Sequence, residues 1–115
     1  MVIWSWPADK TLRPLQDFRR QAGRADSDAC YLGRFLSGIS PDVRVSLIGF
    51  SMGPRIIDGA LHLLGGGTLR GYALPEDQGR KRVRVRAVLW APAVDCHWLW
   101  PGQHHGNALA QDLNV

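Results

Sequence analysis

The sequence predicts an α/β fold in which parallel strands are joined by crossover helices. Two apolar stretches, at 43–48 and at about 83–91, have the length and composition of strands. Between them, apolar residues recur at helical spacing over 56–64. A strand, a helix and a second strand in this order call for a crossover connection, and such connections join parallel strands in a right-handed sense.

The residues before the first of these strands are expected to form one further strand and two helices. Residues 2–7 are typical of a short buried strand that ends at Pro7. A polar loop with a short helix is expected over 8–23, and a second, capped helix from 26 or 27 to 37. The inner stripe of this second helix would consist of Ala29, Leu32, Phe35 and Leu36.

A single serine lies between two glycines where the strand at 43–48 gives way to the helix. Residues 49–53 are Gly-Phe-Ser-Met-Gly, which is the Gly-x-Ser-x-Gly pattern of a nucleophile elbow. A serine raised above the end of a strand needs a tight turn whose backbone conformation costs most residues energy. Gly49 and Gly53 have no Cβ, so the strand and the helix can approach each other closely around Ser51.

The helix that follows supports this interpretation. Its N-terminus would direct unpaired N–H groups and the positive end of its dipole toward an oxyanion beside Ser51, with the N–H of Met52 as the first donor. Pro54 is tolerated in the first turn because its missing N–H has no partner to lose. Glycines at 65–67 then end the helix where a left-handed residue is favoured. A Gly-Ser-Gly turn that only joins a strand to a helix is the alternative.

The second half of the chain is expected to contain a loop, a strand and short terminal elements. Glycine and proline interrupt any pattern over 65–78, which predicts a long surface loop. Arg84 and Arg86 alternate with valines before a run that is apolar on both faces, as in a strand that enters a covered parallel sheet from solvent. A short helix and the opening of another strand are expected at 108–112 and 113–115.

Composition limits the class of protein. The chain has 115 residues, of which 45% are hydrophobic and 21% charged, enough for one small domain with a core. No apolar run could span a membrane and no secretory signal is visible, so the location stays open, with the cytoplasm as the default. Cys30 and Cys96 are expected to be buried free thiols. Neither a metal nor a cofactor is expected, because no metal-ligand spacing involves the four histidines, His62, His97, His104 and His105.

A basic run from Arg80 to Arg86 suggests a different function, the binding of an anionic partner. It holds much of the excess behind the net charge of +4, and a nucleic acid or another anionic partner could bind there. No nucleic-acid-binding motif accompanies the run. A solvated start to the strand is therefore the preferred interpretation, and no specific nucleic-acid partner is expected.

From Trp4 onward the chain resembles the middle of an α/β-hydrolase. It is most similar to a branch with a Ser-Trp-Pro strand, two helices and a Gly-x-Ser-Met-Gly elbow, which correspond here to 5–7, 14–38 and 49–53. Residues 91–95, Ala-Pro-Ala-Val-Asp, resemble the end of the next strand, whereas Phe50 stands where this fold more often has histidine. The resemblance implies a partial hydrolase core over 1–115 and a small-molecule or acyl substrate: an ester, amide or thioester cleaved through an acyl-serine at Ser51.

The resemblance also implies a triad acid and a histidine after the elbow, in that order. Asp95 is the candidate for the acid within this chain, and the alternative is a loop aspartate that caps the turn before Trp98. His97 is too near Asp95 in sequence to hold it and also reach Ser51 easily. His104 and His105 lie in a glycine-rich turn and are expected to face solvent.

The missing partners bear on what this chain does alone. A second oxyanion donor would come from a loop after an earlier strand, and the acid is expected beyond the strand that 114–115 begin. The sequence is therefore expected to be the central fragment of a catalytic domain, inactive alone and prone to self-association through open sheet edges. A binding module that keeps the hydrolase fold without catalysis is the alternative.

Overall fold

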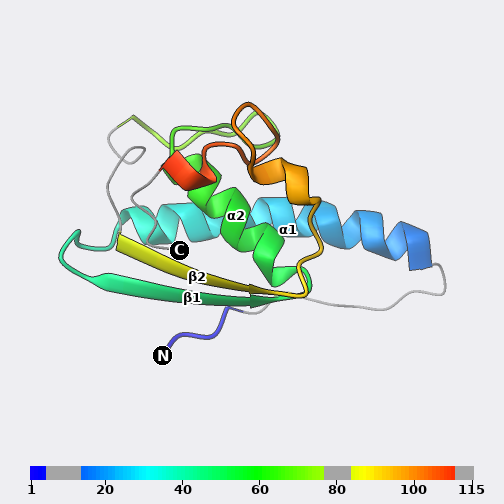
Figure 1. Cartoon of the computed structure of the whole chain (residues 1–115), viewed down its shortest axis with the longest axis horizontal. Helices are drawn as coiled ribbons and strands as arrows, with labels where there is room; N and C mark the ends of the chain where they lie inside the picture. Colours follow the sequence, from blue (N-terminus) through cyan, green and yellow to red (C-terminus); the bar gives the residue numbers. More distant parts are fainter. Residues whose placement is uncertain (5–13, 77–83, 111–115) are drawn as a thin grey trace.

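In the part of the chain that the structure describes, a two-stranded parallel sheet, two α-helices and two short 3-10 helices make up the regular structure (Figure 1). The computed structural model describes residues 1–4, 14–76 and 84–110. The α/β class, the parallel pairing and the crossover helix between the strands are confirmed. In chain order the elements are α1 (Pro14–Ser37), β1 (Arg44–Phe50), α2 (Gly53–Leu64), β2 (Arg84–Trp90) and the short 3-10 helices η1 (Cys96–Leu99) and η2 (Ala108–Ala110).

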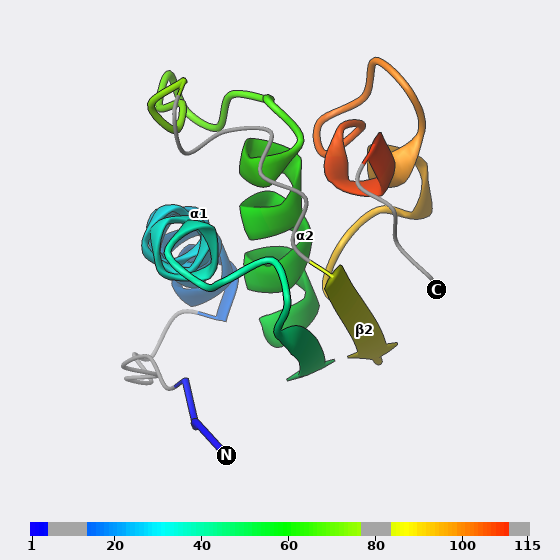
Figure 2. The same ribbon diagram turned by 90° about the vertical axis from the view of Figure 1, so that its left-hand side faces the viewer.

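Helix α2 lies at the centre of the core. It contacts both strands on one side and α1 on another (Figure 2). The apolar spacing that predicts this helix is confirmed, because all of its members are buried: Ile56, Ile57, Ala60, Leu61 and Leu64. The helix ends at Leu64, directly before the glycine triplet, and Gly66 has the left-handed φ of 83°.

Helix α1 is continuous over 24 residues, so the prediction of two separate helices before β1 is wrong. Asp26 and Ser27, the predicted caps of the second helix, lie inside it. Ser27 Oγ donates to the carbonyl of Gly23 at 3.2 Å, and Asp26 is buried against Arg55 of α2. Pairing across the two helices thus overrides the local capping preference. None of the helices in the described residues is long and apolar enough to cross a membrane.

The strand predicted over 2–7 does not form in the portion that is described. Val2 and Ile3 are exposed and belong to no strand. Within the described residues β1 and β2 pair only with each other, so residues 1–4 occupy neither edge of the sheet. The rest of this predicted strand falls within 5–13, outside the described residues.

The inner stripe predicted for the second part of α1 is confirmed with one exception. Ala29, Leu32 and Leu36 are buried in the core. Phe35 is 50% exposed and contacts the ring of Trp4, with the ring centroids 6.3 Å apart. Phe35 lies one position before Leu36, at the edge of the buried face of α1. Its ring therefore contacts Trp4 and not the core.

The sheet has one covered and one uncovered face. The strands pair from Arg44 opposite Arg84 to Phe50 opposite Trp90. Because the helices lie on one side, alternate residues such as Val85 pack into the core. The expectation of a sheet covered on both faces is wrong for the described residues, since four large apolar side chains of the other face are exposed: Ile48, Phe50, Val88 and Trp90.

The connections after the helices also contribute to the core. The loop after α2 is only partly superficial, because Leu69 and Leu74 are buried. A 3-10 helix, η2, stands where a short helix is predicted over 108–112, and Ala108 is buried against the core. The last residues of that prediction and the strand predicted at 113–115 lie outside the described residues.

Candidate active site

Ser51 occupies a strained turn between β1 and α2. Its φ is 56°, in the left-handed region that side chains other than glycine rarely adopt. Its N–H donates to the carbonyl of Trp90 at 3.1 Å, so β1 remains paired with β2 up to this point. The side chain is exposed, and α2 begins two residues later, at Gly53. This is the strand, turn and helix arrangement that the Gly-x-Ser-x-Gly pattern predicts.

Gly49 makes the turn possible. A Cβ at this position would lie 2.7 Å from Pro54 N, 2.8 Å from the carbonyl carbon of Gly53 and 2.8 Å from Ile57 Cδ1. Two of these neighbours are backbone atoms, which cannot move without displacing the first turn of α2. The same close approach predicted for Gly53 is wrong, because a Cβ there would meet nothing within 4 Å.

The N-terminus of α2 presents a backbone N–H next to Ser51 that is bound by none of the described residues. Met52 is the N-cap, with helical backbone angles, and no side chain caps the helix. Among the described residues no acceptor receives the N–H of Met52. The side chain of Met52 is buried, which fixes the peptide that carries this N–H. The donor is thus available for an anion beside Ser51, where the helix dipole also favours negative charge.

The segment after β2 folds back onto the same turn. Ala91 has a φ of 47°, a second left-handed residue at the end of a strand. Two residues later the N–H of Ala93 donates to the carbonyl of Ser51 at 2.8 Å. This hydrogen bond joins the segment that leads to Asp95 to the backbone of Ser51.

Asp95 caps the turn that follows, which is the alternative to its role as a triad acid. It is the N-cap of η1, and its Oδ1 accepts from the N–H of His97 at 2.9 Å. The same oxygen lies 2.8 Å from His97 Nδ1. These hydrogen bonds, first from the backbone and then from the ring of His97, lower the pKa of Asp95. His97 is therefore the imidazole partner of Asp95, although its sequence position argues against it.

No triad is assembled in the described residues. Their histidines make no hydrogen bond to Ser51 Oγ. The Asp95–His97 pair is largely exposed, at 56% for each side chain. The structure thus brings together an acid and an imidazole, and no hydrogen bond within the described residues links either of them to Ser51 Oγ.

His105 is fully buried, so the prediction that it faces solvent is wrong. Its N–H donates to the carbonyl of Trp98 at 2.8 Å, and its ring packs edge-on against the Trp98 ring. Neither ring nitrogen has a hydrogen-bond partner among the described residues. Burial, aided by nearby His104, His62 and Arg55, lowers the pKa of His105 to about 3. His104 is exposed, as expected.

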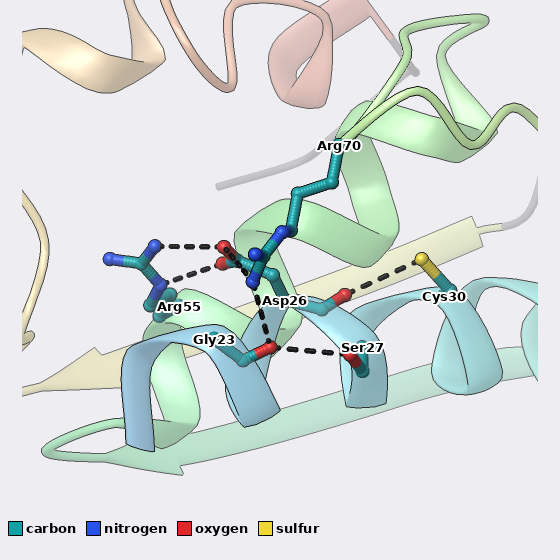
Figure 3. Close-up of polar contacts among 6 residues, drawn as sticks. All are labelled: Gly23, Asp26, Ser27, Cys30, Arg55 and Arg70. Carbon is teal, nitrogen blue, oxygen red and sulfur yellow. Dashed lines mark hydrogen bonds and ion pairs between the residues drawn. The ribbon is translucent and has the colours of Figure 1, made fainter. Parts of the chain in front are cut away.

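Two buried acidic groups on the helices escape sequence reasoning. Burial raises the pKa of Asp58, in the middle of α2, to about 7, and its Oδ2 has no partner among the described residues. Asp26 of α1 is held by Arg55, with Nε to Oδ1 at 2.7 Å and Nη2 to Oδ2 at 3.0 Å (Figure 3). An aspartate inside an apolar helical pattern is the sequence signal that could have identified Asp58.

Arg55 connects the elbow helix to its surroundings. Figure 3 shows its guanidinium forked against Asp26, while Arg70 approaches the same carboxylate at 3.9 Å. The guanidinium also lies 4.7 Å from the ring centroid of Trp98 in η1. Because Arg55 belongs to the first turn of α2, these contacts fix α1 and η1 relative to the elbow.

The two cysteines differ from each other. Cys30 is half-buried, which is close to the expectation of a buried free thiol. Its Sγ donates to the carbonyl of Asp26 at 3.4 Å. Cys96 is exposed, so the expectation that it is buried is wrong: it sits on the exterior turn η1. There its Sγ lies 3.6 Å from His97 Nδ1. Asp95, Cys96 and His97 are the described residues whose donor atoms are close enough to hold a metal ion together.

Comparisons with known proteins give no family for the chain. A scan against family models and searches of curated proteins and of solved structures found no match. The likeness to α/β-hydrolases therefore rests on the motifs in the sequence.

Proposed function

We propose that this chain carries the nucleophile of a serine hydrolase, with Ser51 forming an acyl intermediate from an ester, amide or thioester. The observation that carries the proposal is the backbone of Ser51, which has a φ of 56° between β1 and α2 with an exposed side chain. A strained residue is retained where function needs it. The parallel strands and the crossover helix are consistent with a partial α/β-hydrolase core.

The chemistry would proceed in two steps. A base removes the proton of Ser51 as Oγ attacks the acyl carbon, and the carbonyl oxygen becomes an oxyanion. The N–H of Met52 and the dipole of α2 stabilise this charge. The leaving group departs with a proton, and water then attacks the acyl-serine to release the acid.

Among the described residues an oriented imidazole is present, but it is not bound to Ser51. Asp95 orients His97 through Nδ1, as a triad acid orients its histidine. No described histidine is hydrogen-bonded to Ser51 Oγ, and triad function is strongly cooperative. We therefore expect no meaningful turnover from the chain by itself. The proposal is tested instead by covalent labelling of Ser51 with a fluorophosphonate, with Ser51→Ala as the control.

A second candidate function is binding of an anionic partner. Arg84 and Arg86 are exposed on the uncovered face of the sheet, and Arg44 lies opposite Arg84 on the same face. Arg44 extends the basic run across to the neighbouring strand, a juxtaposition that the sequence does not reveal. Arg80 and its neighbours up to 83 lie outside the described residues.

The arginine surface is tested with a polyanion column. Changing Arg84 and Arg86 to Gln should lower the salt concentration needed for elution from heparin, because fewer counterions are released on binding. Labelling of Ser51 should be unaffected. Sequence-selective nucleic-acid binding that this change abolishes would instead favour binding as the main function.

A further inference from the structure

The exposed turn after β2 gathers three side chains of the kinds that bind transition metals. Asp95 Oδ1 and His97 Nδ1 are 2.8 Å apart, and Cys96 Sγ is 3.6 Å from the same nitrogen. The three donor atoms all lie within 4.8 Å of one another. Four ligands around a tetrahedral zinc ion are about 3.3 to 3.7 Å apart. The cluster therefore needs only a small opening of the Asp95–His97 hydrogen bond to enclose an ion.

Local structure holds two of the three donors, those of Asp95 and His97, in place. The carboxylate of Asp95 caps η1 by accepting from the N–H of His97 at 2.9 Å, so its direction is set by the backbone. The ring of His97 packs edge-on against Trp100, with the centroids 4.5 Å apart. Since the residues are consecutive, no loop has to close when they converge on an ion.

The donor set selects the type of ion. One thiolate, one imidazole and one carboxylate suit Zn²⁺ and chemically similar ions, whereas Mg²⁺ and Ca²⁺ prefer oxygen ligands. The thiolate and the carboxylate together balance the charge of a divalent cation. All three side chains are exposed, so a hydrated ion can reach them and keep water as its fourth ligand.

We propose that Asp95, Cys96 and His97 form a binding site for one zinc-type divalent cation, with the fourth position open to water. Binding replaces the hydrogen bond between Asp95 and His97 by two bonds to the ion, and it releases the protons of the thiol and of His97 Nδ1 if that nitrogen carries one. The site does not depend on the proposed function of Ser51. No spacing in the sequence indicates it, because three adjacent ligands are brought together by the short turn and not by a repeated motif.

Cobalt titration of the full-length chain under reducing conditions tests the site. Co²⁺ substitutes for Zn²⁺, and a bound thiolate gives a charge-transfer absorption in the near ultraviolet. We expect this absorption to saturate at one cobalt per chain and to disappear when Zn²⁺ is added. Native mass spectrometry should show one ion in a single chain. A complex in which one ion bridges two chains would overturn the proposal.

Matched variants locate the ligands. Cys96→Ser should abolish the absorption while Cys30→Ser, at the other free thiol, should leave it unchanged. His97→Ala should weaken cobalt binding at least tenfold, and His104→Ala, at another exposed histidine, should not. Ser51→Ala should bind cobalt normally, which separates this outcome from that of the proposed hydrolase. Absorption that persists in Cys96→Ser, or a wild-type dissociation constant above about 1 mM, would contradict the proposal.

Discussion

The two turns that end β1 and β2 look alike in their backbone and differ in what holds them. Each contains a left-handed residue other than glycine, Ser51 with a φ of 56° and Ala91 with a φ of 47°. The turn at Ser51 lies in close contact with the first turn of α2, because a Cβ at Gly49 would clash with the backbone of that helix. The residues beyond Ala91 soon reach Asp95 and His97, which are exposed and bond mainly to each other.

This difference shows which part of the proposed catalytic site is built into the buried core. The position of Ser51 follows from buried neighbours, because α2 cannot move without disturbing the core. The Asp95–His97 pair is exposed and its own hydrogen bonds contribute little to stability, although the contact between Arg55 and Trp98 holds the rest of η1 near the elbow. Changes on the α2 side should therefore affect stability strongly, and changes in the turn after β2 should not.

The largest effects are expected from buried groups that titrate. The folded state prefers protonated Asp58, with a pKa of about 7, so its contribution to stability is lost as the pH rises from about 4 to about 7. It also prefers neutral His105, with a pKa of about 3, so stability is lost as the pH falls from about 6.5 to about 3. Each effect is worth at most about 5 kcal/mol. Between pH 4 and 6.5 they oppose each other.

Single variants separate the two contributions in urea unfolding measured across this pH range. Asp58→Asn should make stability rise with pH, because only the effect of His105 remains. His105→Gln should make stability fall with pH. Asp95→Asn, in the exposed turn, should leave the profile of the wild type nearly unchanged. If Asp58→Asn has the same profile as the wild type, Asp58 is not buried as a protonated acid.

The two elbow glycines should respond differently to the same substitution. Gly49→Ala places a Cβ against the backbone of Pro54 and Gly53, and such overpacking should cost about 3 kcal/mol. Gly53→Ala meets no atom within 4 Å and should be neutral or stabilising by up to about 1 kcal/mol. Urea midpoints of the two variants give the comparison. Equal midpoints would mean that α2 does not approach β1 at Gly49.

Smaller effects are expected at the two left-handed residues. Ser51→Gly and Ala91→Gly should each stabilise the fold by about 1 kcal/mol, because glycine adopts a positive φ without strain. Thermal unfolding of the two variants measures the gain. A loss of stability in Ser51→Gly would show that the serine is not strained there, and the proposed elbow would lose its main support.

Sequence reasoning succeeded where a local pattern and the packing agree. The apolar spacing of α2, the parallel strands and the turn at Ser51 each follow from residue types at fixed positions. It failed where a distant partner decides the outcome. Asp26 has the features of a helix cap, yet Arg55, 29 positions away, draws it into a buried ion pair in the middle of α1.

The site was predictable to a similar degree. Ser51 and the backbone N–H of Met52 belong to a short motif, so the sequence identifies them as candidates. The burial of His105 depends on Trp98 and on packing near α2, which no spacing near the glycine-rich turn reveals. The pairing of Asp95 with His97 depends on a 3-10 turn whose cap brings two neighbouring side chains to one point.

Covalent labelling of Ser51 tests the central claim most directly. The native chain is exposed to a fluorophosphonate, and the modified serine is located by peptide mass spectrometry. Ser46, which is exposed on β1 five positions before Ser51, provides the matched control as Ser46→Ala. We expect slow labelling confined to Ser51, lost in Ser51→Ala, retained in Ser46→Ala and abolished when the chain is unfolded in urea. Equal labelling of the wild type and Ser51→Ala, or of native and unfolded chain, would contradict the assignment of Ser51 as a nucleophile held in an elbow.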